Sequence, residues 1–247
     1  MKKLIISILL MSPVLMVQAQ EENLVWESIY LTPKLDAISK LNTNMTAHNR
    51  KYHGEGAHVA YVQRVITGRK SGDLVWLMGP GPFANLDTRP SEGGHDEDWS
   101  ANVLPHLTNV SQSEYWRMVS DMNYQPEGEN AINVRIRFYK VKRGQNAAFL
   151  EHYAKIMQVF KEKKYDRALT IYSNVFPTAY GRNMASVSTF NKWADLDSGL
   201  PIGQDFNEIH GEGSWAKWLV TLQELTEWSD QEVRQNMPAL SGPTPEE

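Results

Sequence analysis

The sequence predicts an α+β protein in which one folding unit occurs twice in tandem. Residues 83–87 (FANLD) resemble residues 193–197 (WADLD), and these two segments lie 110 positions apart. Residues 60–63 match residues 171–174 at nearly the same spacing and in the same order. Several ordered matches at one spacing indicate an internal duplication. With 41% hydrophobic and 22% charged residues, the chain also has the composition of a globular protein.

The first unit, residues 24–120, opens with an alternating strand at 25–31. A helix follows, because apolar side chains recur at three- and four-residue steps: Ile38, Leu41, Met45, His48 and Tyr52. Two strands are predicted at 58–66 and 73–79, and the glycines between them suit a hairpin. A second helix is expected to begin near Asp96, and residues 115–119 suggest a fourth strand.

The second unit, residues 132–240, has the same order of elements after a linker at 121–131. Its first strand is predicted at 133–140, and its first helix carries an apolar stripe made of Phe149, Tyr153, Ile156 and Phe160. Strands at 168–176 and 183–190 precede a helix that begins near Gln204. Residues 229–232 (SDQE) have the pattern of a capping box and predict a short last helix. Residues 241–247 are expected to be a loose tail.

The order β-α-β-β-α, with a fourth strand after it, is that of the ferredoxin-like motif. Two tandem ferredoxin-like βαββα(β) repeats predict two sheets that face each other with helices outside. In this order of elements the chain resembles the dimeric α/β-barrel superfamily, fused into one intrachain pseudo-dimer over about residues 24–228. That superfamily includes antibiotic-biosynthesis monooxygenases, haem-degrading enzymes and chlorite dismutase relatives, and the chain is also similar to exported bacterial proteins without an assigned role. The resemblance transfers no functional residue, because these proteins share a fold and not a site.

The N-terminus has the pattern of a secretory signal peptide at residues 1–19. Lys2 and Lys3 precede an apolar run, and small residues stand at the cleavage positions up to Ala19. We therefore expect a periplasmic or secreted protein without a membrane span after cleavage. The chain has no cysteine, which excludes disulfides, thiolate metal sites and cysteine nucleophiles. Its net charge of −4 gives no electrostatic basis for binding nucleic acid.

Alternation along each strand separates an apolar face from a polar and aromatic face. We expect the apolar face to contact the helices: Val25, Ile29, Leu31, Val62, Val75, Leu77, Val134, Ile136, Phe138, Ile171, Val175, Ala185 and Val187. We expect the other face to lie between the two sheets: Trp26, Ser28, Tyr30, Tyr61, Gln63, Trp76, Met78, Arg135, Arg137, Tyr139, Tyr172, Asn174, Ser186 and Ser188.

An enclosed polar face predicts a ligand site, because a buried polar group without a partner costs about 1–3 kcal/mol. The hypothesis is a small ligand with an apolar or aromatic body and an acidic handle, held by guanidinium groups. Its predicted binding residues are Trp26, Tyr61, Gln63, Trp76, Arg135, Arg137, Tyr172 and Asn174. Two alternatives stay open. Acids such as Glu27 could pair with the arginines, or the polar face could lie open to water.

Candidate catalytic residues are His48, Tyr61 and Tyr172. A histidine on an apolar helical stripe is more often a core residue than a catalytic base. The HGEG sequences at 53–56 and 210–213 suit turns and helix ends, and the acids at 96–98 suit a helix N-terminus, so we expect no metal and no cofactor. The functions left open are cofactor-independent oxidation or isomerisation, non-catalytic ligand binding in the envelope or outside the cell, and an accessory role with a protein partner.

Overall fold

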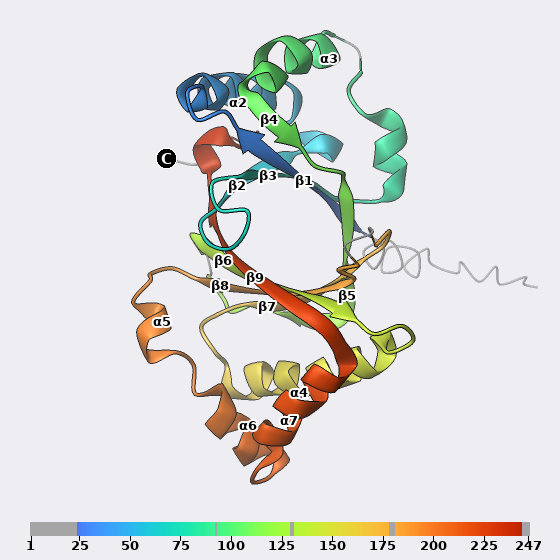
Figure 1. Ribbon diagram of the computed structural model, residues 1–247, viewed down its shortest axis with the longest axis vertical. Helices are drawn as coiled ribbons and strands as arrows, with labels where there is room; N and C mark the ends of the chain where they lie inside the picture. The colour runs from blue at the N-terminus through green and yellow to red at the C-terminus, as the bar shows by residue number, and fades with distance from the viewer. Residues whose placement is uncertain (1–23, 92, 129–130, 178–180, 244–247) are drawn as a thin grey trace, which may run out of the picture.

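Eight strands close into an antiparallel barrel that forms the centre of the molecule (Figure 1). The computed structural model describes residues 24–91, 93–128, 131–177 and 181–243, and the predicted signal peptide lies outside them. The barrel strands are β1 (Val25–Pro33), β2 (Ala60–Val65), β3 (Leu74–Gly81), β5 (Glu114–Tyr124), β6 (Asn133–Val141), β7 (Leu169–Asn174), β8 (Met184–Phe190) and β9 (Thr226–Asn236). A ninth strand, β4 (Leu107–Val110), pairs with the C-terminal end of β1.

Each half of the chain contributes four neighbouring strands to the barrel wall. The first half has the order β5-β1-β3-β2, and the second half has the order β9-β6-β8-β7. Two seams join the halves, where β2 pairs with β9 and β5 pairs with β7. The strand positions predicted from alternation agree with β1, β2, β3, β6, β7 and β8 to within a few residues.

The helices lie outside the barrel, at its two opposite sides (Figure 1). Helix α2 (Ile38–Tyr52) covers the first half and buries Leu41, Met45 and His48, as its apolar spacing predicts. Helices α4 (Asn146–Lys163), α6 (Ile202–His210) and α7 (Ser214–Leu225) cover the second half. The predicted helix near Asp96 is short, because α3 (His95–Asp98) passes directly into a π-helical turn at Trp99–Val103 and a 3₁₀ turn at Leu104–His106. Short turns of helix also occur at α5 (Asp195–Ser198), Gly56–His58, Phe83–Thr88 and Pro238–Leu240.

The predicted C-terminal helix is wrong. The sequence at 229–232 lies inside β9, and Glu232 and Arg234 of this strand point to the same face and bind each other. This pairing and the ladder with β6 stabilise a strand where local capping chemistry alone favours a helix. Strand β5 likewise extends to Tyr124, into the predicted linker.

The first residues of the predicted loose tail are bound to the barrel. The backbone N–H of Val62 donates to Ser241 Oγ at 3.0 Å, and the N–H of Gly242 donates to the carbonyl of Ala60 at 2.9 Å. Residues 244–247 lie outside the described residues. Within the described ranges, no helix has both the length and the apolar character needed to cross a membrane.

Candidate functional site

The barrel encloses a cavity of about 550 Å³. Its walls are mainly aromatic and aliphatic: Trp26, Leu77, Tyr61, Trp116, Val134, Ile136, Phe138, Tyr172, Ala185 and Val187, with Met237 and Pro238 from the segment after β9. A few polar side chains interrupt this surface, among them Ser28, Gln63 and Thr170. Both the volume and the mixture of many apolar walls with few polar groups are typical of a small-molecule site.

Four of the predicted ligand-binding residues line this cavity. Trp26 belongs to β1, Tyr61 and Gln63 to β2, and Tyr172 to β7, so both halves contribute. Burial raises the pKa of Tyr172 above its ordinary value, and the phenol is therefore neutral at physiological pH. Asn174 is not among the lining residues, and its amide nitrogen donates to the backbone carbonyl of Arg182 at 3.3 Å.

The predicted faces of β6 and β8 are wrong, and Arg135 and Arg137 lie on the outside of the barrel. Arg135 Nε donates to Ser188 Oγ at 3.3 Å, and Arg137 donates to Gln231 Oε1 at 2.9 and 3.2 Å. The opposite face of β6, which we expected to contact the helices, lines the cavity with Val134, Ile136 and Phe138. Ala185 and Val187 of β8 also line the cavity. On the outer side of the barrel, the hydroxyl groups of Ser186 and Tyr139 form hydrogen bonds with that of Tyr153 in α4.

Strand β3 is also turned relative to the prediction. Trp76 and Met78 pack with Leu41 and Met45 of α2, and Trp76 Nε1 donates to Asn49 Oδ1 at 3.1 Å. Leu77 instead lines the cavity, and Val75 packs against Tyr30 inside the barrel. The physical reason is the same in all three strands: the barrel interior is itself mainly apolar, so apolar character does not distinguish it from the helix-covered side.

A buried network of charged groups adjoins the cavity. These residues were not predicted from the sequence as part of a site. Arg234 donates to Glu232 Oε1 at 2.6 Å and to the hydroxyl of Tyr30 at 2.7 Å, and that hydroxyl donates to Glu232 Oε1 at 2.7 Å. Arg182 forms a two-pronged pair with Glu114, and its guanidinium lies 4.0 Å from the ring centroid of Phe138.

This network balances its own charge, with two guanidinium groups against two carboxylates. Burial raises the pKa of Tyr30, so its hydroxyl stays protonated and can donate as described. A buried network with its partners satisfied specifies one packing arrangement and leaves no charge for an anionic ligand to neutralise. The alternation of Glu232 and Arg234 within one strand was the sequence signal that could have revealed it.

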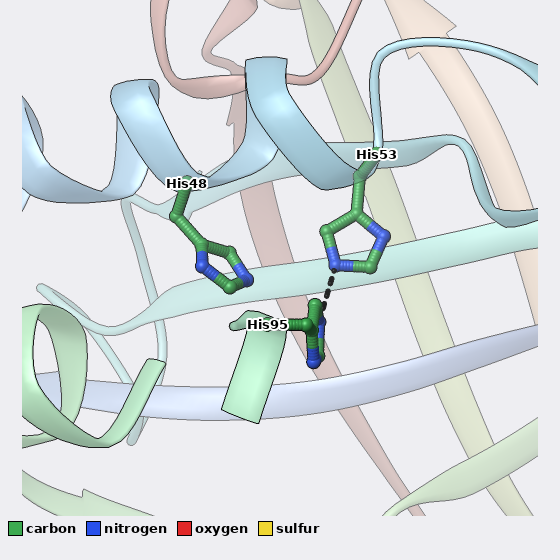
Figure 2. Close-up of side chains that lie close together, drawn as sticks. All are labelled: His48, His53 and His95. Carbon is green, nitrogen blue, oxygen red and sulfur yellow. Dashed lines mark hydrogen bonds between the residues drawn. The ribbon is translucent and has the colours of Figure 1, made fainter. Parts of the chain in front are cut away.

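His48, the remaining catalytic candidate, does not face the barrel cavity. It lies in a second pocket of about 410 Å³ between β1 and β3 on one side and α2 and α3 on the other, together with His53, His95 and Trp76. Figure 2 shows the three imidazole rings turned toward one another. Burial lowers the pKa of His48, and it lowers that of His53 to about 4. Among the described residues, this is the group whose side chains could hold a metal ion.

Glu27 does not pair with Arg135 or Arg137, the partners considered for it from the sequence. Its carboxylate pairs with Arg89 and accepts a hydrogen bond from the hydroxyl of Tyr115 at 3.2 Å. Arg135 and Arg137 bond to Ser188 and Gln231 instead, so Glu27 does not serve as their counter-charge.

Comparison with solved structures identifies the fold. The chain is similar to a provisionally assigned monooxygenase from Lactobacillus acidophilus NCFM, with 10% identity, a TM-score of 0.54, and coverage of 87% of this chain and 94% of that one. It is also similar to an anthrone oxidase-like protein, with 13% identity, a TM-score of 0.57, and coverage of 88% and 93%. A third similar structure is chlorite dismutase from Candidatus Nitrospira defluvii in complex with imidazole, with 7% identity, a TM-score of 0.58, and coverage of 90% and 94%.

These similarities show that the fold is of the ferredoxin-like dimeric α+β-barrel type. At these identities the similarity concerns the fold alone, and it assigns no site residue. No protein-family model matches the sequence, and no curated protein matches it.

Proposed function

We propose that this protein binds a flat, mainly apolar small molecule inside its barrel. The observation that carries the proposal is the cavity of about 550 Å³, which is lined by five aromatic rings supplied by both halves. Broad apolar walls favour a ring system, and Gln63, Thr170 and Tyr172 offer hydrogen bonds that would orient it.

The ligand proposed here is neutral rather than acidic. The acidic handle expected from the sequence depended on Arg135 and Arg137, whose side chains lie on the other face of β6. Arg234, which lines the cavity, is paired with Glu232, and the nearby Arg182 is paired with Glu114. Hydroxyl or carbonyl groups on an aromatic body therefore match this surface better than a carboxylate does.

The first test measures binding of the hydroxynaphthoquinone juglone through quenching of tryptophan fluorescence, since Trp26 and Trp116 line the cavity. Val187→Phe places a ring in the cavity and is expected to weaken binding about tenfold or more, which corresponds to roughly 1.4 kcal/mol. Val220→Phe makes the same change at a side chain that is 55% exposed on α7, and it should leave binding unchanged. Equal binding by both variants and the unmodified protein would rule out the barrel as the site.

The second candidate is enzymatic oxidation of the bound molecule. It is favoured by three neighbours of the same fold that are described as a monooxygenase, as anthrone oxidase-like and as chlorite dismutase. Oxygen uptake in the presence of an anthrone distinguishes the candidates. Uptake that Val187→Phe abolishes supports an oxidase, and a thermal upshift without uptake supports a non-catalytic binding protein.

Two further parts of the proposal concern the origin and location of the chain. We propose that the halves arose by duplication, which is supported by the matching segments 83–87 and 193–197 and by the equivalent strand orders. We also propose export by residues 1–19, on the pattern of the sequence alone. Mass spectrometry of the protein from a cell-envelope fraction would test it, because a chain that retains Met1 contradicts cleavage.

A further inference from the structure

Three histidines from two separate segments meet between the barrel and α2. His48 lies in α2, His53 directly follows that helix, and His95 is the first residue of α3 (Figure 2). One ring nitrogen of each residue lies within 4.8 Å of the corresponding nitrogen of the other two. His48 and His53 are almost completely buried, with exposed fractions of 1% and 3%.

The hydrogen bonds of these rings determine which nitrogens face the centre of the cluster. His48 Nδ1 is 2.7 Å from Asp98 Oδ2, His53 Nδ1 is 2.8 Å from the carbonyl of His58, and His95 Nδ1 is 2.7 Å from Asp96 Oδ1. A carbonyl or a carboxylate accepts a hydrogen bond, so each Nδ1 carries the proton. Each neutral imidazole then presents an unprotonated Nε2 with its lone pair.

Three lone pairs that point at one another repel unless a proton or a metal ion lies between them. His53 Nε2 and His95 Nε2 are 3.2 Å apart, and His48 Nε2 is buried without a hydrogen-bond partner among the described residues. Two nitrogens bound to one tetrahedral ion at about 2.0–2.1 Å stand roughly 3.3 Å apart, so the His53–His95 separation already fits a shared ion. A buried polar atom without a partner calls for an explanation, and a bound ion supplies it here.

We propose that His48, His53 and His95 form a binding site for a divalent first-row transition-metal ion. Three imidazoles without a thiolate suit Zn²⁺ and its neighbours, whereas Ca²⁺ and Mg²⁺ require oxygen ligands. Asp98, Asp96 and the carbonyl of His58 orient the rings by accepting from Nδ1, as the outer partners of metal-bound histidines commonly do. Asp98 is itself positioned by Asn102, whose amide donates to Oδ1 at 2.7 Å.

The fourth coordination position of this ion opens into the pocket of about 410 Å³. The pocket wall contains Trp76, Trp99, Met78 and Arg89 in addition to the three histidines. Three protein ligands plus one open position characterise a metal centre that binds an exchangeable water or small ligand, whereas structural zinc sites use four protein ligands. This site is separate from the barrel cavity, so it does not depend on the function proposed above.

The test uses the full chain without an affinity tag, stripped of metal with EDTA and titrated calorimetrically with Zn²⁺. We expect one equivalent of Zn²⁺ per chain and a Co²⁺ derivative with visible d–d bands. His95→Ala should weaken Zn²⁺ binding at least a hundredfold, and Asp98→Asn should weaken it about 10- to 100-fold. His210→Ala is the matched control, because His210 lies in the second HGEG sequence, on α6, and should leave binding unchanged.

Circular dichroism confirms that each variant is folded, and Asp98→Asn keeps the test valid should His95→Ala unfold. Addition of azide to the Co²⁺ form should shift its absorption bands, since the fourth position is open. The proposal is overturned when the unmodified chain binds neither Zn²⁺ nor Co²⁺. A proton shared between the Nε2 atoms of His53 and His95 would then account for their close approach. It is equally overturned when folded His95→Ala binds Zn²⁺ as tightly as His210→Ala. Val187→Phe should retain full Zn²⁺ binding, so a failure at the barrel cavity and a failure at the histidines are distinguishable.

Discussion

The two halves use the space between sheet and helices in opposite ways. In the second half, rings from α4, α6 and α7 fill this space, and Phe149, Tyr153, Phe206 and Trp218 are buried together. His152 belongs to that packing: its ring stacks on Trp218 at 4.6 Å, its Nε2 bonds the carbonyl of Trp218, and its own carbonyl accepts from the indole.

In the first half the same space holds a pocket and three imidazoles. Of the helices that the structure describes, α2 alone covers it at full length, because the neighbouring chain at 95–106 passes through α3 and short π and 3₁₀ turns. His48 contrasts with His152, since its Nε2 lacks a hydrogen-bond partner within the described chain. The comparison teaches that one strand order can support a side packed with rings and a side whose pocket holds buried imidazoles.

The largest expected effect lies in the packed half. Phe149→Ala removes a fully buried ring from the cluster beneath α4 and should lower the free energy of unfolding by about 3–5 kcal/mol. Urea denaturation followed by circular dichroism measures it. Val220→Ala, at an exposed position of α7, is the control. A loss of less than roughly 1 kcal/mol for Phe149→Ala, the range of ordinary substitutions, would contradict the description of this half as tightly packed.

The next effect concerns the buried network that links the halves. Glu232→Gln leaves Arg234 without its counter-charge beside Tyr30, and breaking a buried pair in this way costs about 3 kcal/mol. The solvent-exposed pair of Arg69 and Asp230 provides the comparison, because Asp230→Asn should cost at most about 1 kcal/mol. Chemical denaturation of both variants gives the two values, and a similar cost for both would show that the interior network contributes no special stability.

A smaller effect compares the two kinds of buried histidine directly. His152→Leu removes the hydrogen bond from Nε2 to the carbonyl of Trp218 and should cost about 0.5–1.5 kcal/mol. His48→Leu in EDTA-treated protein should cost less, because it also removes an unsatisfied nitrogen, and Asp98 is 27% exposed and can bind water instead. Thermal unfolding of the two variants side by side checks the order, and the reverse order would mean that His48 is the better-satisfied residue.

The smallest effect tests the face assigned to β6. Arg137→Met removes an exposed contact with Gln231 and should change stability by no more than about 0.5 kcal/mol. Juglone binding should also be unchanged, as the side chain lies outside the barrel. Loss of binding in this variant, measured by the same fluorescence assay, would mean that Arg137 reaches the cavity.

The order of elements was predictable from local patterns. The spacing of Leu41, Met45 and His48 predicted α2, and alternation placed most of the strands. The face of each strand was harder to predict, because β6 has apolar residues on one face and Arg135, Arg137 and Tyr139 on the other. A long arginine can lie along the outside of a barrel with its head in water, and an aromatic-lined interior accepts Phe138 as readily as a helix interface does.

The histidine cluster could not be predicted from sequence spacing. His53 and His95 are 42 positions apart, and no local motif relates them. They meet because α3 returns to the end of α2 after β3, an arrangement that only the three-dimensional structure shows. The buried pair of Arg182 and Glu114 is likewise formed between segments 68 positions apart.

The closure of the barrel also affects how this protein behaves at high concentration. Each of the eight barrel strands has a hydrogen-bonded neighbour on both sides, including across the β1–β3 pairing. Free strand edges are what allow separate molecules to join edge to edge and aggregate. The same continuous wall that encloses the cavity therefore shields the backbone of these strands from intermolecular pairing.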